Sequence, residues 1–255
     1  MNGNRRGGIR CERIRSALAA GILFAAWAGR AMAGDDLKIA GSRTGEGMEI
    51  RGAVVTMVRP MTRAMDAGAT VFRAASAGMV LANGAEVVTL SSGRCRLALD
   101  TGRILSVGPL TDVRLTWSAS TWGRSVMLLL LKGVIRAEVE GLRAGGYVFG
   151  VQAGYALVGV KGTWFEVARD DERVTVSVFR GHVWILQDVV ADPAVASARL
   201  LELETTEGMK AYTREAGKGL GAVVEEGEQI VIEGRKPLPV PKPIPRGWRD
   251  RIEGL

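Results

Sequence analysis

The stretch from Gly68 to Ile185 consists of short apolar runs, each closed by a corner that contains glycine. Residues 94–100 are one example, with Cys95, Leu97 and Leu99 on one face and mostly charged side chains on the other. This alternation has the two-residue period of a β-strand. Runs of this kind recur at a spacing of roughly ten residues, which predicts an all-β fold. The spacing leaves no room for the crossover helices of a doubly wound sheet.

Strand spacing of this kind favours a β-solenoid-like stack of short strands, with a β-sandwich or a barrel as the alternatives. Val126 to Leu131 is apolar on both faces, which predicts a strand that is covered on two sides. Residues 61–67 contain few strand formers, and we expect a short helical or irregular segment there.

The first 33 residues carry the three zones of a secretory signal peptide. A front rich in arginine precedes an apolar block from Ala17 to Ala28, and Ala31-Met32-Ala33 then precedes Gly34. Small residues at Ala31 and Ala33 predict cleavage before Gly34. The apolar block is shorter than the ~20 residues that cross a bilayer, so we expect no stable membrane span after processing. The predicted location is the periplasm, with secretion beyond it left open.

Removal of that segment changes the charge balance. The whole chain has 34 Lys+Arg against 27 Asp+Glu, a net charge of +7. Residues 1–33 hold six Arg and one Glu, which leaves 28 against 26, or +2. The case for a nucleic-acid partner is lost with those arginines. Cys95 is then the one remaining cysteine, and its place in an alternating strand predicts a buried, inert thiol.

The chain divides into four parts. Residues 1–33 form the predicted signal peptide, and residues 34–51 form a flexible lead-in that is rich in glycine and charge. Residues 52–232 form the β domain, and residues 233–255 form a basic, proline-rich tail. The tail places proline at every second position, at Pro237, Pro239, Pro241, Pro243 and Pro245. This spacing predicts an extended, solvated segment that cannot join the interior of a sheet.

Residues suited to catalysis are few. His182 is the one histidine, it follows Gly181 at a corner, and no nucleophile motif accompanies it. One histidine and one cysteine do not make a zinc site of several such ligands. The cluster Asp170–Glu172 lies between two strands, where we expect a solvated hairpin tip. We therefore predict a protein that is not an enzyme and has no cofactor and no metal.

Several segments resemble the FecR domain. They are Leu81–Thr89, Arg96–Gly102, Leu105–Pro109, Leu131–Ile135, and Val158–Val167 followed by Val174–Val183. Their order matches the order of the glycine-containing steps of that family, with Gly162-Thr163 and Phe165 forming the "G-T-x-F" step. The family motif positions, which the resemblance implies are structural, are Gly102, Gly133, Gly162, Thr163, Phe165 and Gly181.

The resemblance implies a β-solenoid-like periplasmic module that binds a protein partner in the cell envelope and has no catalytic role. The founding regulators of that family also carry a cytoplasmic segment that binds a sigma factor, followed by a membrane helix. In this chain a basic stretch of about fifteen residues precedes the apolar block. We therefore carry over the FecR module and its role in envelope signalling or assembly, but not the control of a sigma factor.

A partner surface is predicted around Trp164 and the prolines Pro237, Pro239 and Pro241. Trp164 has the opposite parity to Phe165 and Val167, so its side chain is expected on the solvent face. The alternative function is binding of an envelope polysaccharide or peptidoglycan, in which Trp117, Trp122 and Trp164 form a stacking platform beside the basic tail.

Overall fold

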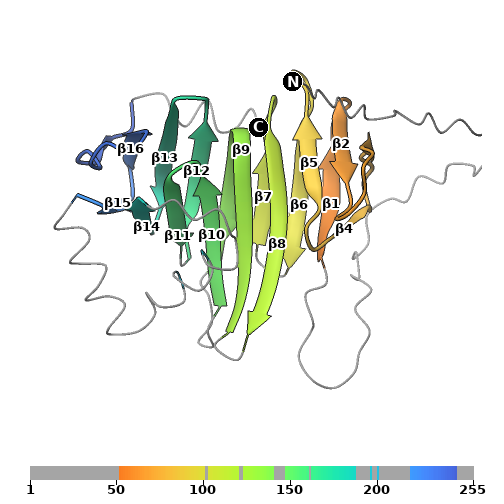
Figure 1. Cartoon of the computed structure of the whole chain (residues 1–255), viewed down its shortest axis with the longest axis horizontal. Coiled ribbons are helices and arrows are strands. Elements are labelled where there is room, and N and C mark those ends of the chain that lie inside the picture. The colour runs from red at the N-terminus through yellow and green to blue at the C-terminus, as the bar shows by residue number, and fades with distance from the viewer. Residues whose placement is uncertain are drawn as a thin grey trace, which may run out of the picture. The chain divides into compact units, whose positions relative to one another are not determined.

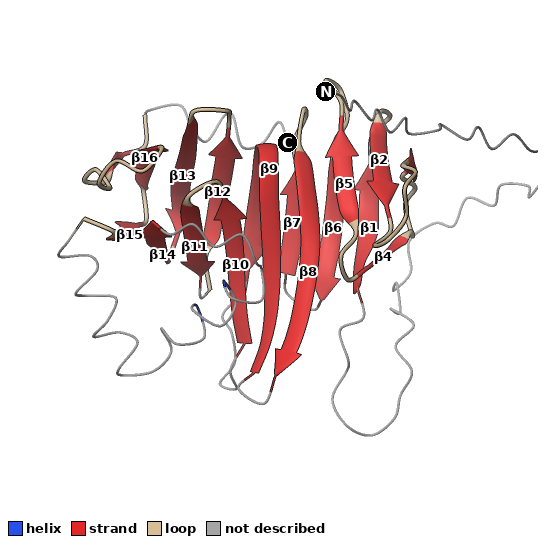
Figure 2. Cartoon of the chain, viewed as in Figure 1, coloured by secondary structure: helices blue, strands red, loops and turns tan. Residues whose placement is uncertain are grey.

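The computed structural model describes residues 52–100, 103–120, 123–140, 147–160, 162–187, 196, 200 and 219–245. The strands are β1 Gly52–Val58, β2 Thr62–Met65, β3 Arg73–Ala74, β4 Val80–Ala82, β5 Glu86–Thr89, β6 Cys95–Asp100, β7 Arg103–Val107, β8 Asp112–Ser120, β9 Gly123–Val139, β10 Tyr147–Ala153, β11 Ala156–Val160, β12 Trp164–Arg169, β13 Arg173–Arg180, β14 His182–Gln187, β15 Gly221–Glu225, β16 Glu228–Glu233 and β17 Lys242–Pro243 (Figures 1 and 2). The predicted signal peptide with its Ala31, Ala33 and Gly34, and the lead-in to residue 51, lie outside the described residues.

The strands form two layers that share one long strand. Sheet A runs in the order β4-β1-β6-β7-β9-β12-β13-β16-β17. Sheet B runs in the order β3-β2-β5-β8-β9-β10-β11-β14-β15. Among these pairs only β9 and β10 are parallel, and all the other neighbouring strands in the two sheets pair antiparallel.

Strand β9 passes from one sheet to the other at Gly133. Its first part pairs with β8 and β10 in sheet B, and its last part pairs with β7 and β12 in sheet A. Gly133 has a φ of 94°, and a Cβ atom at this position would overlap Thr111. Glycine is therefore required both by the backbone conformation and by the close approach of the next corner.

Alternating side chains from both sheets form the core. Phe149 of sheet B and Phe165 of sheet A are fully buried and meet edge to face, with ring centroids 6.3 Å apart and an interplanar angle of 77°. Cys95 is 2% exposed, and burial raises the pKa of its thiol to about 12. The prediction that Cys95 is buried is confirmed, and the raised pKa of its thiol favours the protonated, unreactive form at neutral pH.

The outer face of sheet B carries a second apolar cluster. Met127, Leu157 and Leu186 pack there against Ala196 and Leu200, two residues in helical conformation. The prediction that this strand is covered on two sides is confirmed for Val126–Leu128, where Val126 and Leu128 are in the core and Met127 is in this cluster, but not at Leu131, which is 37% exposed. Among the described residues, no helix has both the length and the apolarity to cross a membrane.

The all-β prediction is confirmed, and the barrel alternative is wrong, because the two sheets remain open at their ends in the described part of the chain. Two facing layers correspond to the sandwich alternative, and the solenoid-like form of the stack stays a prediction. The expected helical or irregular segment at residues 61–67 is wrong at Thr62–Met65, which form β2 by pairing with β5. Long-range pairing overrides the weak local strand propensity there.

Candidate partner-binding surface

The family motif residues hold two corners of the stack together. Thr163 is fully buried, and its Oγ1 donates a hydrogen bond of 2.8 Å to the carbonyl oxygen of His182. Gly162 and Gly181 have φ angles of 71° and 83°, and a Cβ on Gly181 would lie 3.0 Å from the carbonyl oxygen of Gly162. These contacts are those of structural residues. Gly102 lies outside the described residues.

Trp164 lies on the outer face of sheet A, opposite in parity to the fully buried Phe165. Its ring meets Phe179 edge to face, with centroids 5.2 Å apart and an interplanar angle of 60°. The guanidinium of Arg136 lies 5.6 Å from the centre of the Phe179 ring and forms a 2.6 Å ion pair with Glu166. Trp164 is therefore half-buried in a packed cluster, so only part of the ring is available for stacking on a ligand.

The cluster continues across sheet A toward its end. Cross-strand partners on the same outer face are Arg136, Glu166, Ser177, Gln229 and Lys242, one from each of five consecutive strands. The predicted surface residues Trp164 and the prolines are thus linked through one face, although they lie more than seventy positions apart in the sequence.

At the end of sheet A, residues 236–245 form what we call the strap. Leu238 N donates to Gly219 O at 2.8 Å, and Ile244 N donates to Gly227 O at 2.8 Å. Lys242 and Pro243 pair with Gln229 and Glu228 of β16. The strap is mostly exposed and stays out of the sheet interior, as its proline spacing predicted. The sequence did not predict its docking: the prolines donate no hydrogen bond, but the residues between them anchor the strap at both ends.

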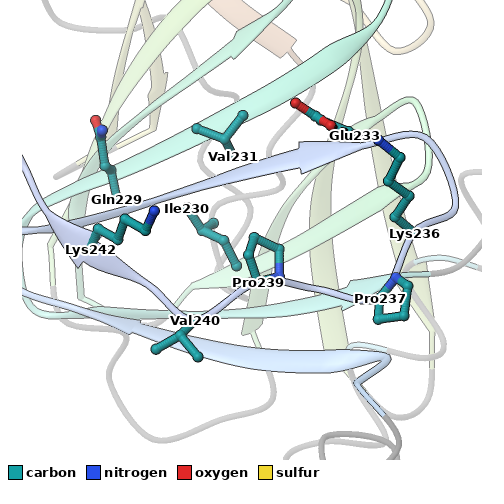
Figure 3. Close-up of a pocket in the computed structure, with 9 residues that line it drawn as sticks. All are labelled: Gln229, Ile230, Val231, Glu233, Lys236, Pro237, Pro239, Val240 and Lys242. Atoms are coloured by element: carbon teal, nitrogen blue, oxygen red, sulfur yellow. Dashed lines mark hydrogen bonds and ion pairs between the residues drawn. The ribbon is translucent and has the colours of Figure 1, made fainter.

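Between its two anchors the strap encloses a pocket of about 300 Å³ against β16 (Figure 3). Its lining is Gln229, Ile230, Val231, Glu233, Lys236, Pro237, Pro239, Val240 and Lys242. Pro237 and Pro239 of the predicted partner surface line this pocket, whereas Pro241 is not among the lining residues. Val240, which the sequence did not single out, is 81% exposed.

Charge around the pocket is mixed. Lys236 Nζ lies 2.9 Å from Glu233 Oε2, and this hydrogen bond raises the pKa of Lys236 and lowers the pKa of Glu233. Both groups are fully exposed, so the pair supplies little binding energy by itself. Lys242 at the other end of the pocket is exposed and has no ion pair within the described residues. The pocket therefore offers an apolar floor with a cation available at one end.

The remaining candidates carry no reactive arrangement. The ring of His182 is half-buried beside Trp184, with centroids 5.4 Å apart. Asp170 accepts backbone hydrogen bonds from Glu172 and Arg173, which lower its pKa and close the predicted hairpin tip. No group of three or more metal-ligating side chains is gathered in the described part of the chain.

The tryptophans predicted as a stacking platform are not brought together in a described surface. Trp117 packs partly against the core, and its backbone N–H donates to Asn83 Oδ1 at 2.8 Å. Trp122 lies outside the described residues.

Fold and surface together define an all-β domain of stacked antiparallel strands whose last sheet edge is partly covered by a proline-rich strap. Residues 85–184 match the family model described as "FecR protein". Residues 85–184 are therefore similar to a FecR domain, and this segment includes every family motif position named above. The match ends in β14 and does not include β15–β17 or the strap.

Two related crystal structures are among the solved structures that match the chain. They are crystal structures, at 2.50 Å and 1.65 Å resolution, of a candidate anti-sigma factor from Parabacteroides distasonis. Each aligns with a TM-score of 0.41, at 18% and 19% identity, over 62% of this chain and 59% of the other. The aligned part thus spans less than two thirds of the length of those proteins. No curated protein matches the chain.

Proposed function

We propose that this protein is a non-catalytic, periplasmic interaction module of the FecR-domain type, which binds a protein partner in signalling or assembly of the cell envelope. The FecR match over residues 85–184 supports the signalling role. The three-zone signal at residues 1–33 supports export. The buried Cys95 thiol and the half-buried His182 support a role without catalysis.

The observation that carries the proposal is the incompletely covered edge of β16. On one side, β16 pairs with β13 along Gln229–Glu233. On the other side, β17 pairs only with Glu228 and Gln229 among the described residues. Beyond Gln229 the strap bends away, so the pocket lies along the backbone of Ile230–Glu233.

A sheet edge of this kind presents backbone N–H and C=O groups to an extended chain. A partner segment that adds as a strand would gain main-chain hydrogen bonds from β16, while alternate side chains would enter the pocket. Val231, which shares the outer face with Gln229, would contact those side chains. Lys242 favours a carboxylate near the end of the partner segment.

Photo-crosslinking in cells tests this proposal. A photoreactive amino acid at Val240, which is 81% exposed, should capture one envelope protein, because Val240 lines the pocket. The same amino acid at Val71, which is 73% exposed and lies between β2 and β3 at the other end of the stack, should not capture it. The product at Val240 should disappear in the Val231→Lys variant, whose added charge occupies the pocket.

A melting curve of Val231→Lys confirms that the variant folds, since Val231 lies on the outer face and not in the core. Capture of the same protein from Val71, or capture that Val231→Lys leaves unchanged, would overturn the pocket as the site. Retention of the protein on purified peptidoglycan that is lost in Trp164→Ala would instead identify a glycan ligand and refute the proposal of a protein partner.

A further inference from the structure

Two bulky residues occupy a backbone conformation that normally selects glycine. Met61 and Leu110 have φ angles of 65° and 53°, and they are the two non-glycine residues with positive φ in the described part of the chain. Each follows a proline and precedes a threonine, as Pro-Met-Thr at 60–62 and Pro-Leu-Thr at 109–111. Proline followed by positive φ is the pattern of a type II turn, in which glycine or asparagine is usual. Large apolar side chains therefore occupy strained backbone positions, and such positions cluster at functional sites.

Both side chains are exposed, and backbone hydrogen bonds through Leu90 join their two corners. Met61 is 51% exposed and Leu110 is 59% exposed, and Leu90, between them, is 39% exposed. Leu90 N donates to Met61 O at 2.9 Å, and Leu110 N donates to Leu90 O at 3.2 Å. We name these three residues the corner ridge. Their corners follow β1, β5 and β7, and the last two of these strands end at the same border of the domain in Figure 1.

A buried threonine fixes each residue of the corner ridge. Thr62, Thr89 and Thr111 are next to Met61, Leu90 and Leu110 in the sequence, and each is at most 3% exposed. Their hydroxyls donate to backbone carbonyls of neighbouring corners: Thr62 to Arg94 at 3.2 Å, Thr89 to Gly108 at 2.6 Å, and Thr111 to Val134 at 3.1 Å. The ridge is therefore held in place from beneath, and its exposed side chains contribute little to that support.

Cations flank the ridge. Arg59, Arg63 and Lys132 are exposed, and none of them forms an ion pair in the described part of the chain. Further along the same border the sign changes, because Gly133 pairs with Arg169 and the acidic hairpin Asp170–Glu172 follows. The border thus combines the corner ridge with positive charge at one end and carries negative charge at the other.

We propose that the corner ridge inserts among the headgroups of an anionic lipid bilayer while Arg59, Arg63 and Lys132 contact the lipid phosphates. Turn tips are convex, and a convex tip enters a deformable lipid surface more readily than it fits into a rigid groove. Exposed Met and Leu side chains gain free energy when they enter the acyl boundary, and nearby Arg and Lys add attraction to anionic lipid. This surface is distinct from the strap pocket and does not depend on the partner proposed above.

Vesicle binding of the full chain tests the proposal, with phosphatidylcholine vesicles that contain about a third phosphatidylglycerol. Leu110→Asn should lower the partition coefficient about tenfold through the loss of apolar insertion. Arg63→Glu should lower it by at least about fivefold, an effect that added salt removes. Because the apolar block at residues 17–28 is common to all variants, each effect is measured relative to the unchanged chain.

Leu110→Asn also separates this role from a structural one. Asparagine tolerates positive φ, so the melting temperature of this variant should stay level or rise while binding falls. Val240→Asn, which removes an 81% exposed apolar side chain from the strap, is the matched control and should bind vesicles normally.

A site-specific probe shows whether the ridge itself enters the lipid. An environment-sensitive dye on Ser92→Cys, beside Met61, should shift to the blue on anionic vesicles. The same dye on the exposed Ala82→Cys should not shift, because Ala82 pairs with Gly52 at the opposite end of β1. Cys11 is replaced by serine for this experiment, and Cys95 is protected by its buried, protonated thiol. No shift at Ser92→Cys, or binding that Leu110→Asn and Arg63→Glu leave unchanged, would overturn the proposal.

Discussion

Leu200 and two glycines of sheet B form a close contact that can be tested by a double-mutant cycle. Gly150 and Gly159 are cross-strand partners on β10 and β11, and the missing side chains leave a depression on the outer face. Leu200 fills it and is 3% exposed. A Cβ on Gly159 would lie 2.6 Å from Leu200 Cδ2, which no real contact of that type allows. We expect Gly159→Ala to force Leu200 out of place.

The expected changes in the free energy of unfolding come from overpacking in Gly159→Ala and from loss of burial in Leu200→Ala. Gly159→Ala should lower the free energy of unfolding by about 1–3 kcal/mol, the usual cost of an added methyl group in a packed site. Leu200→Ala should lower it by about 2–3 kcal/mol, toward the low end for buried leucine because the outer face can relax. In the Leu200→Ala background, Gly159→Ala should cost nothing or stabilise by up to about 0.5–1 kcal/mol, since alanine suits a strand better than glycine.

Urea unfolding of the four proteins, followed by circular dichroism, measures the coupling. The double variant should be no less stable than Leu200→Ala, which gives an interaction energy of about 2 kcal/mol between the two sites. Gly154→Ala is a matched control at a glycine with φ of 55°, where the added Cβ contacts only Arg169 and Val174 at 3.6 Å or more. The loss of unfolding free energy in Gly154→Ala should come from strain at the positive φ, and it should be the same with and without the Leu200 side chain. Additive effects of Gly159→Ala and Leu200→Ala would refute the packing argument.

Three further predictions concern buried polar groups. Thr163→Val should lower the free energy of unfolding in urea by about 1–2 kcal/mol through the lost hydrogen bond to His182, whereas Thr163→Ser should retain most of it. Cys95 should react with a thiol reagent only at the rate of unfolding, and a fast reaction at pH 7 would contradict this. The raised pKa of its thiol in the folded state also predicts that its contribution to stability is complete below pH 9.0 and declines as the pH rises toward about 12. Burial first, and then the charge of Glu86, raise the pKa of Asp112, so its ionised form is disfavoured in the fold. Asp112→Asn should therefore gain stability relative to the unchanged chain as the pH rises from the acid range through that raised pKa, and a difference in melting temperature that does not change with pH would contradict the assignment.

Strand parity was the part of the fold that the sequence predicted well. Cys95, Leu97 and Leu99 are all at most 2% exposed, as their alternation required. The continuity of β9 through Gly133 was not predictable, because Lys132-Gly133 has the composition of a turn. Only the pairing of each half of β9 with a different sheet shows that Gly133 bends a strand and does not end it.

The candidate binding surface was predicted in part. Parity placed Trp164 on the outer face, but its contact with Phe179 depends on the pairing of β12 with β13, which the sequence does not encode locally. The strap was missed because proline signals exclusion from a sheet interior, and that rule does not forbid an edge. The residues between the prolines could have indicated that the strap docks. Unlike proline, Leu238 and Ile244 have backbone N–H groups, and these groups form the hydrogen bonds that anchor the strap.

The ends of the two sheets show how one segment can both protect an edge and leave room for a partner. Sheet edges invite pairing between copies, and short edge strands and proline are common protections. At one end β3 and β4 are only two and three residues long. At the other end β17 is two residues long and contains Pro243, so a second copy cannot pair along the whole of β16. The bend between Lys236 and Lys242 leaves Ile230–Glu233 accessible only to a chain narrow enough to lie beside the strap. The prolines that prevent unselective pairing therefore also restrict the proposed partner to a short extended segment.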